Sequence, residues 1–129
     1  MVNHQHTDII AFETIPCLTE VRALIKLLQT RPEAKAWISV STNSETTLCS
    51  GELLTEFARL VEFSDQYNQV EAIGVNCSDP KLTAKQIELL RGVTQKTLIF
   101  YPNNGDVWDG QKMEWVKLGE ESQPTLWSE

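Results

Sequence analysis

The stretch "VEAIGVNCSDP", residues 70–80, joins an apolar run to a cysteine and a turn. Residues 70–76 predict a buried β-strand, because the run is short, apolar and bounded by turn residues. Asp79 and Pro80 then lead toward a helical pattern. Cys77 lies between the strand and the turn. A thiol at this position can be a small packed core residue or a thiolate that faces solvent, and the stretch alone leaves both open.

The same alternation of strand and helix extends on both sides of this stretch. Strands are predicted at residues 7–13, 35–41, 70–76 and 96–102. Amphipathic helices are predicted at residues 14–30, 51–66 and 84–93, because apolar side chains recur at spacings of three and four. The apolar positions expected to be buried are Leu18, Val21, Leu24, Ile25 and Leu28, followed by Leu53, Leu54, Phe57, Leu60 and Val61. Thr83 and Gln86 match a capping box for the third helix.

The order β-α-β-α-β-α-β predicts an α/β fold with parallel strands and right-handed crossovers. Two architectures are compatible with this order. One is a small, doubly wound, flavodoxin-like binding domain. The other is about half of a (β/α)8 barrel, since a complete barrel needs about 250 residues and the chain has 129. We expect one domain with no boundary before residue 103, followed by a polar and irregular segment.

Composition and charge exclude several classes of protein. The chain has 41% hydrophobic residues, and its 11 basic and 18 acidic residues give a net charge of −7. This balance disfavours binding to nucleic acid or to an anionic membrane. No apolar run approaches the roughly 20 residues that span a bilayer, and the start lacks the features of a signal peptide. We therefore expect a cytoplasmic protein with neither nucleic acid nor membrane as a partner.

The three cysteines and two histidines form no recognisable metal or disulfide pattern by themselves. Cys17, Cys49 and Cys77 are widely spaced and odd in number, which argues against a disulfide framework or a CxxC zinc ribbon. His4 and His6 lie in the N-terminal segment, where a role in a site is disfavoured. No histidine follows a predicted strand, so a cysteine hydrolase is also disfavoured. Phosphate-binding and hydrolase motifs are absent as well.

Polar residues follow all four predicted strands, at the end where ligands gather in parallel α/β folds. They are Glu13 and Thr14, Ser39 and Ser41, Asn76 and Cys77, and residues 101–105. Each has a structural alternative: Glu13 can offset a helix dipole, Asn76 can cap a turn, and Cys77 can be a packed thiol. Four such groups together predict a shared mouth, with Cys77 beside Glu13 and beside Tyr101 and Pro102.

Five segments resemble the homocysteine S-methyltransferase family in order and spacing. They are "DIIAFETIPCLTEVRAL", "AWISVS", "SGELL", "AIGVNCSDP" and "YPNNGDVWDG". The likeness covers roughly residues 7–118 and is strongest to members that use S-methylmethionine or S-adenosylmethionine as methyl donor. "GVNC" followed by "YPNNG" is the specific part of this resemblance, whereas "ETIP" alone is weak.

The resemblance implies a (β/α)8 barrel with zinc at its mouth. In the family the metal is held by the cysteine of GVNC and by two adjacent cysteines of a later GGCC motif. Cys77 matches the first ligand, and residues 1–129 contain no GGCC. The chain therefore resembles a central-to-C-terminal part of the barrel that lacks the first strands and the GGCC segment. Glu13 matches the carboxylate that binds the amino group of homocysteine, and Asn76 matches a position that shapes the same substrate site.

The activity implied by the resemblance is methyl transfer from a sulfonium donor to homocysteine, which gives methionine. Zinc suits this chemistry because coordination deprotonates a thiol that otherwise has a pKa near 8.5. The alternative is a truncated or split product that is inactive or acts only with another chain. For the chain by itself we expect weak zinc binding and no methyl transfer, because zinc sites need three or four protein ligands.

Overall fold

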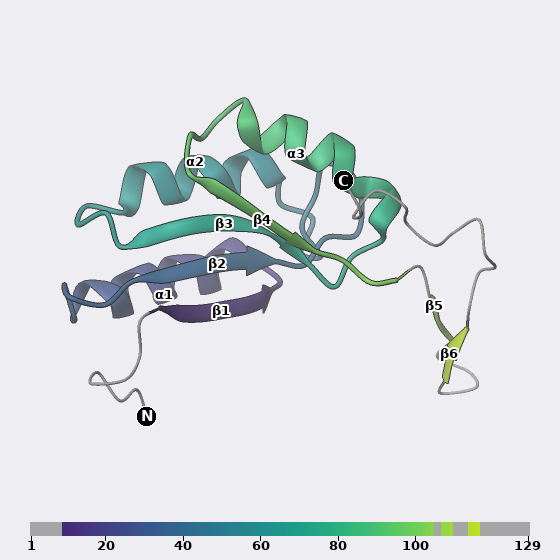
Figure 1. Cartoon of the computed structure of the whole chain (residues 1–129), viewed down its shortest axis with the longest axis horizontal. Coiled ribbons are helices and arrows are strands. Elements are labelled where there is room, and N and C mark those ends of the chain that lie inside the picture. The colour runs from purple at the N-terminus through teal and green to yellow at the C-terminus, as the bar shows by residue number, and fades with distance from the viewer. Residues whose placement is uncertain (1–8, 105–106, 110–113, 117–129) are drawn as a thin grey trace.

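The structure, a computed structural model, describes residues 9–104, 107–109 and 114–116. A single parallel sheet carries the fold (Figure 1). Its strands are β1 (Ile10–Ile15), β2 (Ala36–Val40), β3 (Val70–Asn76) and β4 (Thr97–Tyr101). The connecting helices are α1 (Leu18–Gln29), α2 (Leu54–Ser64) and α3 (Thr83–Arg91), with a short 3-10 turn, η1 (Pro80–Leu82), before α3. This confirms the predicted α/β order.

The strands lie in the order β1-β2-β3-β4, and every neighbouring pair is parallel. A doubly wound sheet reverses its strand order at a switch point, and the described sheet has no such reversal. The successive helices also contact one another, α1 with α2 and α2 with α3. The flavodoxin-like alternative is therefore wrong for the described residues.

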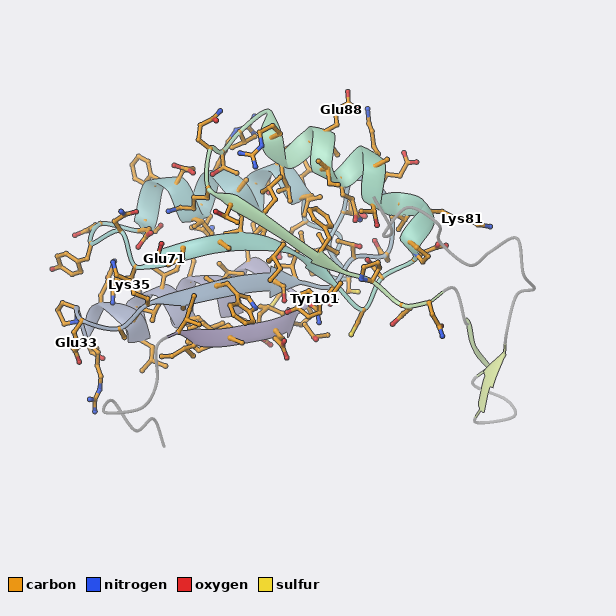
Figure 2. The ribbon with its side chains drawn as sticks, viewed as in Figure 1. Glu33, Lys35, Glu71, Lys81, Glu88 and Tyr101 are labelled. Atoms are coloured by element: carbon orange, nitrogen blue, oxygen red, sulfur yellow. The ribbon has the colours of Figure 1, made fainter. Side chains whose placement is uncertain are left out.

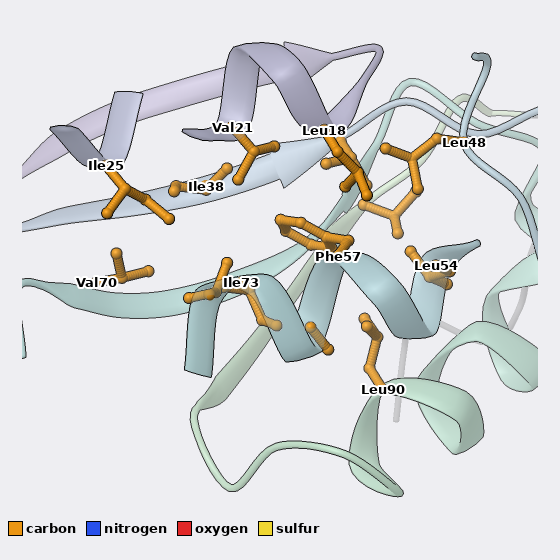
Figure 3. Close-up of a cluster of buried hydrophobic side chains, with 14 of the residues drawn as sticks. Leu18, Val21, Ile25, Ile38, Leu48, Leu54, Phe57, Val70, Ile73 and Leu90 are labelled. Atoms are coloured by element: carbon orange, nitrogen blue, oxygen red, sulfur yellow. The ribbon is translucent and has the colours of Figure 1, made fainter. Parts of the chain in front are cut away.

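One face of the sheet is covered by the three helices. Alternate strand residues, such as Ile38 and Ile73, pack there against Val21 and Phe57 from the helices (Figure 3). Each of these four side chains is fully buried. The periodicity of α1 and α2 explains the packing, because their apolar side chains fall on one side of each helix. The buried residues of these two helices are Leu18, Val21, Ile25, Leu28, Leu54, Phe57, Ala58 and Val61.

The opposite face carries the residues that alternate with this core. The pairing sets Ser39 beside Gly74 and Asn76 beside Tyr101. Gly74 is required by close approach of the backbones, because a Cβ atom there would lie 1.6 Å from the carbonyl oxygen of Ile99. The glycine of the GVNC motif is thus explained by packing between β3 and β4.

Charged and polar side chains anchor the amino end of the sheet. The carboxylate of Asp65 accepts hydrogen bonds from the backbone N–H groups of Gln69 and Val70, and it pairs with Lys96 at 3.1 Å. The amide of Gln69 donates to the carbonyl oxygens of Leu28, Arg31 and Ala34 at the end of α1. At the same end, Lys35 pairs with Glu71 at 3.7 Å (Figure 2).

Four details differ from the sequence-based expectation. Strand β1 continues through Ile15, two residues beyond the predicted end, and α1 begins only at Leu18. Leu53 is exposed rather than buried, because it precedes the first turn of α2, and Leu24 and Leu60 are only half-buried. The predicted capping box is wrong: Gln86 turns away from the helix start and donates to Thr42 and Ser44.

The fourth difference concerns the segment after residue 103, which we predicted to be irregular. It contains an antiparallel pair, β5 (Val107–Asp109) and β6 (Glu114–Val116). His4, His6 and Gly105, which the sequence analysis considered, lie outside the described residues. Within the described residues, no helix is long and apolar enough to cross a membrane.

Candidate functional site at the carboxyl ends of the strands

The predicted site residues meet at the carboxyl end of the sheet. Cys77 directly follows β3, and its backbone N–H donates to the carbonyl oxygen of Tyr101 at 3.2 Å. The hydroxyl of Tyr101 donates to Oε1 of Glu13 at 3.0 Å, so β4 is joined to β1 across the mouth. Figure 2 marks Tyr101 at this end of the sheet. The expected neighbourhood of Cys77, Glu13 and Tyr101 is therefore present.

Asn76 is the centre of the hydrogen-bond network. Its Oδ1 accepts the backbone N–H of Thr14 and the hydroxyl of Ser39, each at 2.9 Å. Its Nδ2 donates to Oγ1 of Thr14 at 2.7 Å and to the thiol of Cys77 at 3.4 Å. The backbone N–H of Thr14 can only donate, which determines the orientation of the amide. A substrate contact by Asn76 would have to displace one of these four bonds.

Thr14 and Cys77 both adopt the left-handed backbone conformation, with φ of 59° and 51°. This conformation is unfavourable for a β-branched residue such as Thr14. At Thr14 it coincides with the irregular register between Phe12 and Ile15 in β1. Strained residues persist only where their surroundings hold them, and they concentrate at functional sites. Asn76 stabilises the left-handed conformation of Thr14, because it is hydrogen-bonded to both the backbone and the side chain of this residue.

Tyr101 links three strands through its hydroxyl group. The indole N–H of Trp37 donates to it at 3.3 Å, and Oγ of Ser39 lies 2.8 Å from it. Burial raises the pKa of the Tyr101 phenol above its ordinary value; hydrogen bonds with Ser39 and Trp37 lower it, and the neighbouring Glu13 raises it. The phenol is therefore a neutral donor at physiological pH. Sequence reasoning did not single out Trp37, although its spacing of two from Ser39 puts both on one face.

Cys77 is exposed and its thiol is free, which rules out the packed-core alternative. Cys17 and Cys49 also lie at this end of the sheet, on loops joined by a hydrogen bond from the N–H of Ser50 to the carbonyl oxygen of Pro16. Even so, the described residues contain no cluster of three histidine, cysteine or acidic side chains that could hold a metal ion. Cys77 alone cannot complete a zinc site.

The comparisons with known proteins decide the family. The model of the homocysteine S-methyltransferase family matches residues 1–128. The chain belongs to this family. It is 38% identical to homocysteine S-methyltransferase YbgG of Bacillus subtilis over 108 residues, which cover 84% of this chain and 33% of the relative. It is 37% identical to homocysteine S-methyltransferase 3 of Zea mays over 111 residues, which cover 85% and 32% of the two chains.

A solved structure of the family has a similar fold. The apo form of the homocysteine methyltransferase MmuM from Escherichia coli is 34% identical and superimposes with a TM-score of 0.72, over 79% of this chain and 38% of that one. A metallated form of the same enzyme matches equally well, over 34% of its chain. The chain thus spans about a third of the length of the curated relatives it matches.

Proposed function

We propose that the protein transfers a methyl group to the sulfur of homocysteine. The observation that carries this proposal is the junction of Cys77 and Glu13 through Tyr101 at one end of the sheet. An amino thiol needs a cation-binding carboxylate, which Glu13 would supply, and a metal that activates sulfur, for which Cys77 would supply one ligand. The family match over residues 1–128 supports the same conclusion.

Within this proposal, the four strands are consecutive members of a (β/α)8 barrel. The support is the sequential parallel order, with the helices packed on one face. In such a barrel the opposite face lines the interior, and the carboxyl ends form the active-site mouth. Glu13, Asn76 and Cys77 lie at those ends.

Cys77 fits the role of one zinc ligand. Its thiol is exposed, and the side-chain N–H of Asn76 donates to the sulfur at 3.4 Å. Soft sulfur ligands suit zinc, and the metallated relative is in keeping with a metal in the family. The remaining ligands are outside the described residues in this proposal, because these residues offer no group of three. When bound, zinc would supply the deprotonation of the substrate thiol.

Each site residue then has its own role in the proposed methyl transfer. The carboxylate of Glu13 binds the ammonium group of homocysteine and so positions the substrate. Asn76 orients the thiol of Cys77 and holds Thr14. The homocysteine sulfur attacks the methyl carbon of a sulfonium donor, S-methylmethionine or S-adenosylmethionine. A new sulfur–carbon bond forms while the bond to the donor sulfur breaks, and the donor leaves as a neutral thioether.

The test is a methyl-transfer assay with the protein expressed from the chain's own gene. Methionine formation from L-homocysteine is measured with each of the two donors, together with bound zinc per protein. Glu13→Gln is expected to raise KM for homocysteine, and Cys77→Ser is expected to abolish zinc binding and turnover. Glu56→Gln and Cys49→Ser are the matched controls, an exposed carboxylate on α2 and an exposed thiol on a loop. If methionine forms with neither of the two donors, the proposal is contradicted.

A second candidate concerns residues 1–129 taken alone. We propose that these residues lack activity until another chain completes the barrel. They offer Cys77 as one candidate zinc ligand, and β1 and β4 are the edge strands of the described sheet. Unpaired edges also favour association. Purified residues 1–129 are expected to bind zinc weakly and to form no methionine. Tight, stoichiometric zinc binding by the monomer would overturn this candidate.

A further inference from the structure

We propose that Tyr101 is a positioning residue for the amino group of the substrate. Its hydroxyl donates to Oε1 of Glu13 at 3.0 Å and so restrains an exposed carboxylate. A carboxylate has two oxygens and about four acceptor positions, so one held oxygen leaves room for an ammonium group on the other. This inference rests on the proposed function, because it takes the Glu13 carboxylate as the binder of the substrate amine.

The phenol can restrain Glu13 because two residues of β2 hold its hydroxyl group in turn. The indole N–H of Trp37 donates to the phenol oxygen, and Ser39, which is fully buried, contacts the same oxygen at 2.8 Å. At the backbone, the carbonyl oxygen of Tyr101 accepts the N–H of Cys77. Tyr101 therefore couples the position of the carboxylate to the strand end that carries the thiol.

A count of protons shows why the phenol donates to Glu13. Oδ1 of Asn76 is an acceptor, so the single proton of the Ser39 hydroxyl is committed to it. Tyr101 then has one proton for two acceptors, Glu13 at 3.0 Å and Ser39 at 2.8 Å. An ionised carboxylate is the stronger acceptor, so the Tyr101 proton is directed at Glu13.

An ammonium group can bind the carboxylate oxygen that this bond leaves open. The amine donates to the second oxygen of Glu13, while the Tyr101 hydroxyl keeps its bond to the first oxygen, Oε1. A thiol that carries no amine brings no such donor. The network therefore distinguishes an amino thiol from its deaminated analogue, and the distinction depends on the Tyr101 hydroxyl.

The test compares two ligands on the zinc-loaded protein expressed from the chain's own gene. Dissociation constants are measured by titration calorimetry for L-homocysteine and for 4-mercaptobutanoate, which has the thiol and the carboxylate but no amine. Tyr101→Phe is expected to weaken L-homocysteine binding about fivefold. Without the hydroxyl, the Glu13 side chain regains rotamer freedom, and ligand binding must then order it again. Binding of 4-mercaptobutanoate is expected to change less than about twofold. Tyr67→Phe, which removes an exposed phenol, is the matched control.

The outcomes separate this inference from the proposed function. If the wild-type protein binds neither ligand, the proposed function is wrong, and the inference that rests on it is wrong as well. If the wild type binds L-homocysteine and Tyr101→Phe weakens both ligands equally, or neither, only the inference is overturned. If Tyr101→Phe does not fold, Trp37→Phe replaces it, because it removes the N–H that holds the phenol. This variant is expected to weaken L-homocysteine binding about twofold and to leave the analogue unchanged.

Discussion

Asn76 accepts the backbone N–H of Thr14 at 2.9 Å, across 62 residues of sequence. The bond joins the ends of β3 and β1, which are not neighbours in the sheet. It spans the end of β2, where Ser39 completes the contact with the same amide oxygen. Two left-handed residues, Thr14 and Cys77, are both hydrogen-bonded to this one side chain. The geometry of the mouth therefore depends on a single buried amide.

Replacing this amide should cost a large part of the fold's stability. Asn76→Ala leaves the N–H of Thr14 and the hydroxyl of Ser39 without their acceptor, and buried unpaired groups cost about 1–3 kcal/mol each. We expect the free energy of unfolding to fall by about 2–4 kcal/mol in urea denaturation. Asn43→Ala, in an exposed loop, should lose less than about 1 kcal/mol. Equal losses in the two variants would contradict this account.

Gly74 should be among the least replaceable residues of the sheet. The Cβ of Gly74→Ala would meet the Ile99 carbonyl at 1.6 Å, so β3 and β4 would have to separate. The expected loss is more than about 3 kcal/mol of unfolding free energy, measured by thermal or urea denaturation. Gly92→Ala is the matched control: its φ is −68° and its closest contact would be 3.4 Å. That variant should unfold within about 1 kcal/mol of the wild type.

The pair of Lys96 and Asp65 should contribute more to stability than a surface pair. Their side chains are 14% and 4% exposed, and Lys96→Met would leave the Asp65 carboxylate buried without its cation. Such a change costs about 3–5 kcal/mol. Lys85→Met breaks the exposed pair with Glu88 and should cost less than about 0.5 kcal/mol. Urea denaturation measures the loss of unfolding free energy in both variants, and similar losses would refute the prediction that the buried pair contributes more.

Tyr101 predicts a specific pH dependence of stability. Its pKa is raised in the folded state, first by burial, above an unfolded value near 10. Between the two pKa values the folded state binds more protons than the unfolded state, so the free energy of unfolding falls as pH rises above about 10. Tyr101→Phe removes this contribution. Urea denaturation between about pH 9 and 11 should therefore show a steeper loss for the wild type than for the variant, and parallel losses would contradict the assignment.

Much of the fold follows from local pattern. The helical spacing of Val21, Ile25 and Leu28 predicted the buried face of α1, and the apolar run of residues 70–76 coincides with β3. The ends of elements were less predictable, because they depend on distant partners. The N–H of Leu18 at the start of α1 is accepted by Glu52, 34 residues away, and no local rule indicates that contact.

The site was predictable as a set of positions but not as a network. Parallel strands bring their carboxyl ends together, which is why Glu13, Cys77 and Tyr101 could be grouped in advance. The bonding of Asn76 could not be foreseen, because it depends on the left-handed turn at Thr14. Gln86 shows the same limit: its capping signal was local, but the loop at Thr42 and Ser44 competes for its amide.

The Asp65, Gln69 and Lys96 cluster lies at the end of the sheet opposite the mouth, and this separation bears on how the sequence can diverge. Side chains that share no partners change stability nearly additively. Exposed residues around Glu13 can therefore be varied in a library while the anchoring cluster is kept constant, so that the stability contributed by this cluster is retained. A lineage under natural selection would have the same freedom.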